Sequence, residues 1–323
     1  MKIPLVLVAL LIVSVSYGQK FEGLAMTPPM GWNSWNKFGC DVSEKLIKEI
    51  ADAMVSSGMK DAGYEYVVID DCWQVGRDEN GNIIPDPERF PSGMKALADY
   101  IHARGLKFGI YSDAGIKTCQ GRPGSRGYEF QDAGTYAAWG VDYVKYDWCN
   151  TSTQNAQASY KLMRDAIYKA GRPMVFSLCD WGLSKPWLWA KDVGHLWRAT
   201  DDIMDCWACG DDRNNAGFTI LLDRVADLYS YSGPGHWNDP DMLEVGNSGL
   251  TVSESRAHFS LWCVLAAPLI AGNDIRDMSD ETKEILTNKE VIAVDQDPLG
   301  KSGIKVRDDG DLEVWVKQLA DGG

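Results

Sequence analysis

The chain has 323 residues, of which 45% are hydrophobic and 24% are charged, so it can bury a large core and has the length of one α/β barrel or of two average domains. Its formal net charge of −14 and the lack of any run of Lys and Arg argue against nucleic acid or an anionic membrane surface as a partner. The 13 Trp and 13 Tyr suit either a core or a sugar-binding cleft, because their rings combine apolar faces with a polar group. Composition alone favours the core.

The N-terminus has the pattern of a signal peptide. Lys2 precedes an apolar run from Ile3 to Val15, and small residues follow before the polar Gln19. The run is short for a membrane span, and an uncleaved anchor is the alternative to a cleaved signal peptide. We predict cleavage near Gly18, so that residues 1–18 are removed and the protein is exported, secreted or periplasmic, with no membrane attachment afterwards.

A repeated unit of helix, glycine, apolar strand and acid runs through the chain. Asp41 with Glu44 resembles a capping box before the first helix. Five segments end in an acidic residue at the C-terminal end of a strand, namely Asp71, Asp113, Asp147, Asp180 and Asp202. Further strands are expected at Met30 to Trp35, at His236 and Trp237, and from Pro268 to Ala271. Eight strands alternating with helices predict a (β/α)8 TIM barrel over residues 24–300. A doubly wound open sheet is the alternative, but it would not place acids after nearly every strand.

The acids at the strand ends have two interpretations. Asp113 and Asp180 could simply cap the helices that follow. Asp147 and Asp202 fit that interpretation less well, because each has a nearby cation. Lys145 lies two residues before Asp147 and shares its face of the strand, while Arg198 lies four residues before Asp202. Since a cation lowers a carboxyl pKa and burial raises it, the two acids can differ in protonation, and we expect Lys145 to help keep Asp147 ionised.

Two such aspartates across an aromatic-rich cleft are the minimum apparatus for glycoside hydrolysis, with one as nucleophile and the other as acid/base. Clustered acids can also bind a metal ion. Asp239 and Asp241, on either side of Pro240, could hold a hard cation, which would suit a metal-dependent hydrolase. The four His are scattered and lack metal-ligand spacing, so a site without metal is favoured.

Seven motifs resemble glycoside hydrolase family 27, the melibiase-type α-galactosidases, from about Thr27 to the C-terminus. They are MGWNSWN, IDDCW, GIYSDAGIKTC, VKYDWC, WRATDDI, GPGHWNDPDMLEVGN and VIAVDQDPLG. The resemblance implies a (β/α)8 barrel followed by an antiparallel β-domain, no metal or other cofactor, and a retaining double displacement. Asp147 then matches the nucleophile and Asp202 the acid/base, while Lys145 and Arg198 match residues that contact the sugar.

The rest of the pocket is also implied by the resemblance. Trp35 matches the tryptophan on which galactose packs, and Asp70 and Asp71 match the acids that bind the 4- and 6-hydroxyls. Tyr111, Cys119 and Asp241 match further contact positions. Cys179 and Trp181 resemble the plant-type enzymes and favour a plain 2-hydroxyl, although Asp180 replaces Glu between them. An α-N-acetylgalactosaminidase and a β-L-arabinopyranosidase are the alternatives within the family.

Eight cysteines in an exported chain make disulfides plausible. Cys206 and Cys209 have the spacing of a metal or redox pair, but disulfide or free thiols is the safer interpretation, because a zinc site would need a second pair. The resemblance implies two disulfides near the active-site end, Cys40 with Cys72 and Cys119 with Cys149.

After DQDPLG, residues 301–323 predict two short strands around Asp308 to Gly310, which we interpret as the start of an incomplete antiparallel β-sandwich domain. The leading functional hypothesis is an exo-acting α-galactosidase that acts on galactose-containing oligosaccharides or glycans. A non-catalytic sugar-binding barrel is the alternative from a different class; it would need neither Asp147 nor Asp202.

Overall fold

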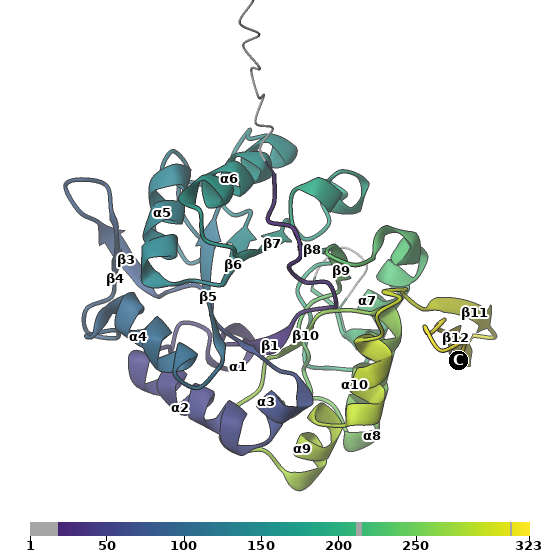
Figure 1. Ribbon diagram of the computed structural model, residues 1–323. Coiled ribbons are helices and arrows are strands. Elements are labelled where there is room, and N and C mark those ends of the chain that lie inside the picture. Colours follow the sequence, from purple (N-terminus) through teal and green to yellow (C-terminus); the bar gives the residue numbers. More distant parts are fainter. Residues whose placement is uncertain (1–18, 211–214, 311) are drawn as a thin grey trace, which may run out of the picture.

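Eight parallel strands form the central sheet of the computed structural model, which describes residues 19–210, 215–310 and 312–323. The strand order is β10-β1-β2-β5-β6-β7-β8-β9, with helices around the outside (Figure 1). The predicted signal peptide, residues 1–18, lies outside the described residues. The barrel fold class is confirmed. Its strands are β1 (Met30–Asn33), β2 (Tyr66–Ile69), β5 (Lys107–Asp113), β6 (Tyr143–Asp147), β7 (Val175–Cys179), β8 (Leu196–Arg198), β9 (Trp237–Asp239) and β10 (Leu269–Ala271).

The two ends of the sheet, β9 and β10, are joined by a residue just beyond β9. The Leu243 N–H donates to the Ile270 carbonyl at 2.8 Å, and the Leu243 carbonyl accepts from the Gly272 N–H at 3.0 Å. This bridge completes the ring, so that the carboxyl ends of all eight strands surround one mouth.

Helices cover the outside of the barrel as the helical spacing predicts. The predicted capping box is wrong, because Ser43 caps α2 by accepting from the Leu46 N–H at 3.3 Å. Glu44 is instead the first residue of α2, and its carboxylate accepts from the Ser92 N–H ahead of α4 at 2.9 Å. The helices are α1 (Trp35–Phe38), α2 (Glu44–Ser56), α3 (Met59–Ala62), α4 (Gly93–His102), α5 (Glu129–Trp139), α6 (Ala156–Ala170), α7 (Phe218–Val225), α8 (Val252–Leu265), α9 (Asp280–Leu286) and α10 (Lys289–Asp295), with 3-10 turns η1 (Pro186–Leu188), η2 (Ala190–Asp192) and η3 (Ala226–Tyr231).

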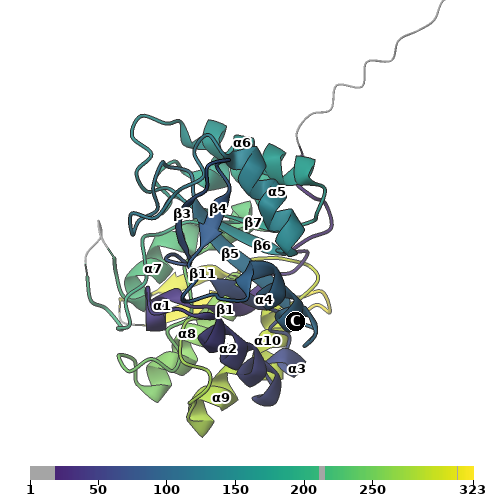
Figure 2. The same ribbon diagram turned by 90° about the vertical axis from the view of Figure 1, so that its left-hand side faces the viewer.

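The segment before β1 covers the amino ends of the strands. Leu24 and Ala25 pack against a buried apolar cluster that includes Tyr66 and Trp237. The Lys20 ammonium donates to three carbonyl groups there, at 2.6 to 3.0 Å. Figure 2 shows α1 on one side of the barrel and this segment on the other. The bottom of the barrel is therefore sealed, which leaves the opposite mouth for a ligand.

Two small antiparallel hairpins extend the fold. One, β3 (Gln74–Arg77) with β4 (Ile83–Pro85), follows β2 and was not predicted. The other, β11 (Ile304–Asp308) with β12 (Glu313–Val316), lies where the sequence indicated two short strands (Figure 1). That residues 301–323 begin a β-sandwich domain stays a prediction. Of the described helices, none has the length and apolar character needed to span a membrane.

Candidate active site

A cavity of about 470 Å³ opens at the carboxyl ends of the strands. Nearly all site residues predicted from the sequence line this cavity. They are Trp35, Asp70, Asp71, Tyr111, Cys119, Lys145, Asp147, Trp181, Arg198, Asp202 and Asp241. Cys179 is the exception: it ends β7 and is buried, with its sulfur 3.7 Å from an Arg198 nitrogen. The barrel therefore gathers residues from six of the seven motifs, together with Trp181 after β7, into one polar pocket.

Asp147 is the last residue of β6, and only 5% of it is exposed. Its Oδ1 accepts from the Trp148 N–H at 2.9 Å. Burial raises the pKa of Asp147 to about 6, although the nearby Lys145 ammonium acts in the opposite direction. The expectation that Lys145 favours the ionised form is therefore correct in sign, but burial has the larger effect.

Lys145 lies between two acids. Its ammonium donates to Asp70 Oδ2 at 2.8 Å, and its side chain is 14% exposed. Burial alone would lower the pKa of Lys145, but Asp70 and Asp147 hold it well above its ordinary value. Lys145 is therefore a permanent cation in the pocket.

Asp202 lines the same pocket and lies in the loop after β8. Its carboxylate accepts from Arg198 Nη2 at 3.0 Å, and the same nitrogen lies 3.1 Å from Asp241 Oδ2. The Asp202 side chain is 45% exposed, whereas that of Arg198 is 3% exposed. Burial pushes the pKa of Asp202 up, but Arg198 and then Lys145 outweigh it, so this pKa lies below its ordinary value of 3.8.

The two aspartates therefore titrate as a pair in which Asp202 loses its proton first. Between the lowered pKa of Asp202 and about pH 6, the pair holds one proton, and this proton lies mostly on Asp147. Because the pKa of Asp202 is lowered and that of Asp147 is raised, the form that carries the proton on Asp202 is the minor one. A reaction that needs ionised Asp147 and protonated Asp202 must use this minor form, or must raise the pKa of Asp202 when substrate binds.

The pair Asp70 and Asp71 follows β2. Asp70 Oδ2 accepts from the Asn33 side chain at 2.8 Å as well as from Lys145, and Asp71 accepts from the Gln120 N–H at 3.0 Å. Both residues are at most 2% exposed. These fixed acceptors at the pocket wall are suited to hydroxyl groups, which can donate to them.

The hypothesis of a metal site at Asp239 and Asp241 has little geometric support. Asp241 Oδ2 lies beside the Arg198 guanidinium and accepts from the Ile203 N–H at 2.8 Å, while Asp239 accepts from the Asp241 N–H at 2.8 Å.

Asp180, the acid that replaces Glu, accepts from the Ser184 N–H at 3.0 Å and so closes a local turn. Asp180 caps no described helix, because the next helical turn, η1, has Lys185 at its N-cap position, so these contacts assign Asp180 a structural role in the loop.

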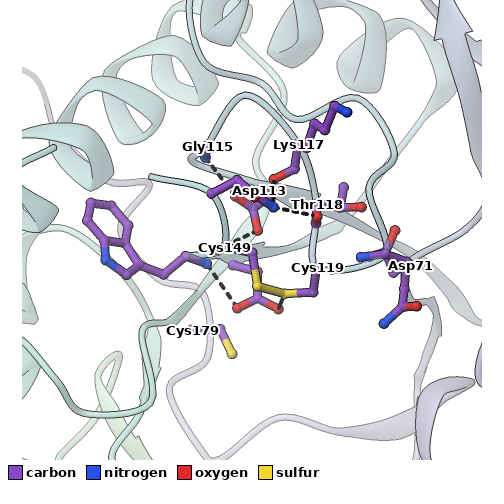
Figure 3. The surroundings of a disulfide bond; sticks show 12 residues. Asp71, Asp113, Gly115, Lys117, Thr118, Cys119, Cys149 and Cys179 are labelled. Atoms are coloured by element: carbon purple, nitrogen blue, oxygen red, sulfur yellow. Dashed lines mark hydrogen bonds between the residues drawn. A yellow bond between two sulfur atoms is a disulfide. The ribbon is translucent and has the colours of Figure 1, made fainter. Parts of the chain in front are cut away.

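Three disulfides are present in the described residues, including the two that the family resemblance implied. Cys40 and Cys72 have Cα atoms 5.2 Å apart, and those of Cys119 and Cys149 are 5.1 Å apart. Cys206 and Cys209 form the third, whereas Cys179 and Cys263 are free and buried. The sulfurs of Cys119 and Cys149 lie close to acidic oxygens (Figure 3), but as a disulfide they are not thiolate ligands for a metal ion.

Sequence reasoning missed several residues of the cavity wall, which lie inside the recognised motifs or in the loops after β8 and β9. Glu244 is the most buried of them, and it accepts from Asn36 and, at 2.5 Å, from Asn247. Burial raises the pKa of Glu244 to about 7. Its position in the DPDMLEVGN motif was the available signal. The others include Asn36, Lys37, Ile203, Asp205, Asn215, Met242, Asn247 and Ser248.

A closed parallel barrel with two aspartates in different electrostatic surroundings at its mouth is the architecture of a glycoside hydrolase. The sequence profile of the family described as Alpha galactosidase A matches residues 27–297, and the chain belongs to this family. It is 62% identical over 320 residues to alpha-galactosidase A of Cellvibrio japonicus, a match that covers 98% of this chain and 79% of that relative.

Solved structures agree with the family assignment. The fold matches alpha-galactosidase I from Mortierella vinacea with a TM-score of 0.90 at 43% identity, over 93% of this chain and 80% of that one. A structure of α-galactosidase from Saccharomyces cerevisiae with raffinose matches with a TM-score of 0.89 at 36% identity, over 93% and 73% of the two chains.

Proposed function

We propose that the protein is an exo-acting α-galactosidase that hydrolyses terminal α-linked galactose with retention of configuration. The observation that carries the proposal is the pair Asp147 and Asp202. Asp147 ends β6 and Asp202 lies in the loop after β8; both line one cavity, and their pKa values are shifted in opposite directions. Family membership and the similarity to α-galactosidases support the same reaction.

In the first step, Asp147 attacks the anomeric carbon, and Asp202 protonates the departing glycosidic oxygen. Asp202 then takes a proton from water, which attacks the anomeric carbon and releases Asp147. The leaving group would cover Asp202, which is 45% exposed without ligand. Exclusion of solvent from Asp202 raises its pKa and so favours the protonated form that the first step needs.

Several side chains suit a galactosyl ring. Trp35, at the start of α1, offers an aromatic face. Asp70 and Asp71 offer acceptors for the 4- and 6-hydroxyls, and the Lys145 ammonium holds Asp70 in place. A sugar without a matching axial hydroxyl would leave an acceptor position of these carboxylates unfilled, which costs affinity. Cys179 and Trp181 leave the region after β7 suited to a plain 2-hydroxyl.

We infer that the substrates are neutral oligosaccharides or glycans with a terminal α-galactosyl group, by analogy with the raffinose seen with the yeast relative. The basic and apolar start of the sequence indicates export, so we place the protein in a secreted or periplasmic location.

Initial rates with p-nitrophenyl α-galactoside, α-N-acetylgalactosaminide and β-L-arabinopyranoside test the proposal. The α-galactoside should be preferred, with the α-anomer of galactose released first as followed by NMR. Asp147→Asn should abolish turnover. Asp202→Ala should reduce hydrolysis of melibiose far more than that of the aryl galactoside, whose leaving group needs little protonation. Sugar binding without turnover would support a binding protein instead.

A further inference from the structure

A second acid lies directly behind Asp147. Asp113 is the last residue of β5, and it pairs with Asp147 in the register of β5 and β6. Asp113 is completely buried, and its carboxylate oxygen lies within 4.8 Å of one from Asp147. The mechanism above does not use this residue.

The Asp113 carboxyl group binds the backbone of two loops. It accepts from the Gly115 N–H at 2.6 Å and from the Cys149 N–H at 2.9 Å (Figure 3). In return, the Ala114 N–H donates to the Asp147 carbonyl at 2.9 Å. Asp113 therefore fixes the chain on both sides of the position from which the Asp147 side chain projects.

The two loops are in close contact at this point. A Cβ atom on Gly115 would lie 2.0 Å from the Cys149 carbonyl oxygen, so only glycine permits the approach. The Cys119–Cys149 disulfide covers the same place, with the Cys119 sulfur 3.6 Å from Asp147 Oδ2. Asp113 thus lies beneath the disulfide. It holds the β5 end of the loop between Asp113 and Cys119, whereas the disulfide holds the Cys119 end.

Charge distinguishes the two acids. Burial, followed by the charge of Asp147, raises the pKa of Asp113 to about 8. Asp147 has the Lys145 ammonium beside it, whereas Lys117 extends away from Asp113 in Figure 3. The other ionisable groups that face Asp113 are acids or neutral phenols, namely Asp71, Tyr111, Tyr146 and Tyr160. Two carboxylates this close do not both ionise readily.

We propose, on the basis of the function proposed above, that Asp113 is a positioning residue for the nucleophile. It stays protonated when Asp147 ionises, and it fixes the backbone around Asp147 through the Gly115 and Cys149 N–H groups. It does not contact the substrate.

Asp113→Asn tests this role, because the side chain keeps its shape and stays neutral but replaces one acceptor oxygen with a donor. We expect kcat for p-nitrophenyl α-galactoside to fall by about 10- to 100-fold, the effect of a slight misplacement of a reacting group. The inhibition constant of galactose should change by less than about twofold, since ground-state binding uses other residues. The alkaline limb of the pH profile should stay in place, because no charge is removed.

Asp142→Asn is the matched control. Asp142 also links the same two strands, by accepting from the Phe108 N–H at 2.9 Å, but at the opposite end of the barrel. It should lower stability without lowering kcat. If Asp113→Asn does not fold, Asp113→Ser retains one acceptor and should show the same separation of kcat from galactose binding.

Three results would overturn the inference. They are a kcat close to that of the wild type, an equal loss of galactose binding, and an alkaline limb lowered by about one pH unit, which would mean that Asp113 carries a charge. Failure of the proposed function is a separate outcome, because it would appear as a wild-type protein that does not hydrolyse α-galactosides.

Discussion

Replacement of Lys145 by Gln should move the whole pH profile of the enzyme to higher pH. The Lys145 ammonium is 2.8 Å from Asp70 Oδ2 and is two residues from Asp147 on β6. Its charge lowers the pKa of Asp147 and also that of Asp202. Gln keeps most of the volume and removes this charge, so both aspartates should become harder to ionise.

The size of the change follows from the charge that is removed. A cation within about 4 to 6 Å lowers a carboxyl pKa by about 1 to 3 units. Activity requires one proton on the pair, so kcat/KM in the wild type should decline above about pH 6, the pKa to which burial raises Asp147. Loss of the cation raises the pKa of an acid. The alkaline decline in Lys145→Gln should therefore begin about 1 to 3 pH units higher, which corresponds to about 1.4 kcal/mol per unit.

The assay is kcat/KM for p-nitrophenyl α-galactoside from pH 3 to 9, with product measured after the reaction is stopped in alkali. The maximum value should also fall, because Lys145 is proposed to contact the sugar, but the position of the limb does not depend on that loss. Lys107→Gln is the matched control, since Lys107 begins β5 at the other end of the barrel and pairs with Glu65 at 2.7 Å. An alkaline limb that stays in place in Lys145→Gln would refute the electrostatic reasoning.

Two further predictions concern stability. Asp147→Asn should raise the free energy of unfolding at pH 7 by about 1 to 3 kcal/mol, because an acid whose pKa is raised by burial destabilises the fold above that pKa. The gain should disappear below about pH 4, where Asp147 is protonated in both the folded and unfolded states; urea unfolding at both pH values measures it. Replacing Cys119 and Cys149 by Ser should lower the free energy of unfolding by about 3 kcal/mol, since this disulfide joins positions 30 residues apart. The same change at Cys206 and Cys209, which are 3 residues apart, should lower it by less; thermal unfolding compares the two variants.

The barrel could be predicted because five of its strands are short apolar runs, each preceded by a glycine and followed by an acid. Strands β5 and β6 end at Asp113 and Asp147, as that pattern indicates. The first strand is shorter than predicted, because Trp35 begins α1 and its N–H is held by the Asn33 side chain at 2.8 Å. The sealed bottom could not be predicted, since its contacts, such as Trp237 Nε1 to the Ala25 carbonyl, join residues 212 apart.

Because the motifs lie at strand ends, most residues of the pocket could be predicted from the sequence. The strength of each electrostatic effect could not. Lys145 was expected to keep Asp147 ionised, yet the burial that outweighs it depends on the packing of the whole barrel. The role of Glu244 was equally inaccessible, because it binds Asn36 across 208 residues of sequence. Local patterns show which side chains are available, whereas their pKa values depend on the assembled site.

The charges around Asp147 and Asp202, the proposed catalytic aspartates, suit the transition state better than the substrate. Lys145 pairs with Asp70, and Arg198 pairs with Asp241, so these two buried cations are already matched by two carboxylates. Asp147 and Asp202 then add two carboxyl groups that share one proton, and Asp71 lines the same cavity, so the carboxyl groups of the pocket outnumber these two cations. A neutral galactoside does not balance this negative charge, but the oxocarbenium character that develops during bond cleavage does. The attraction between the negative pocket and the sugar is therefore strongest in the transition state. Binding energy that appears only there accelerates a reaction.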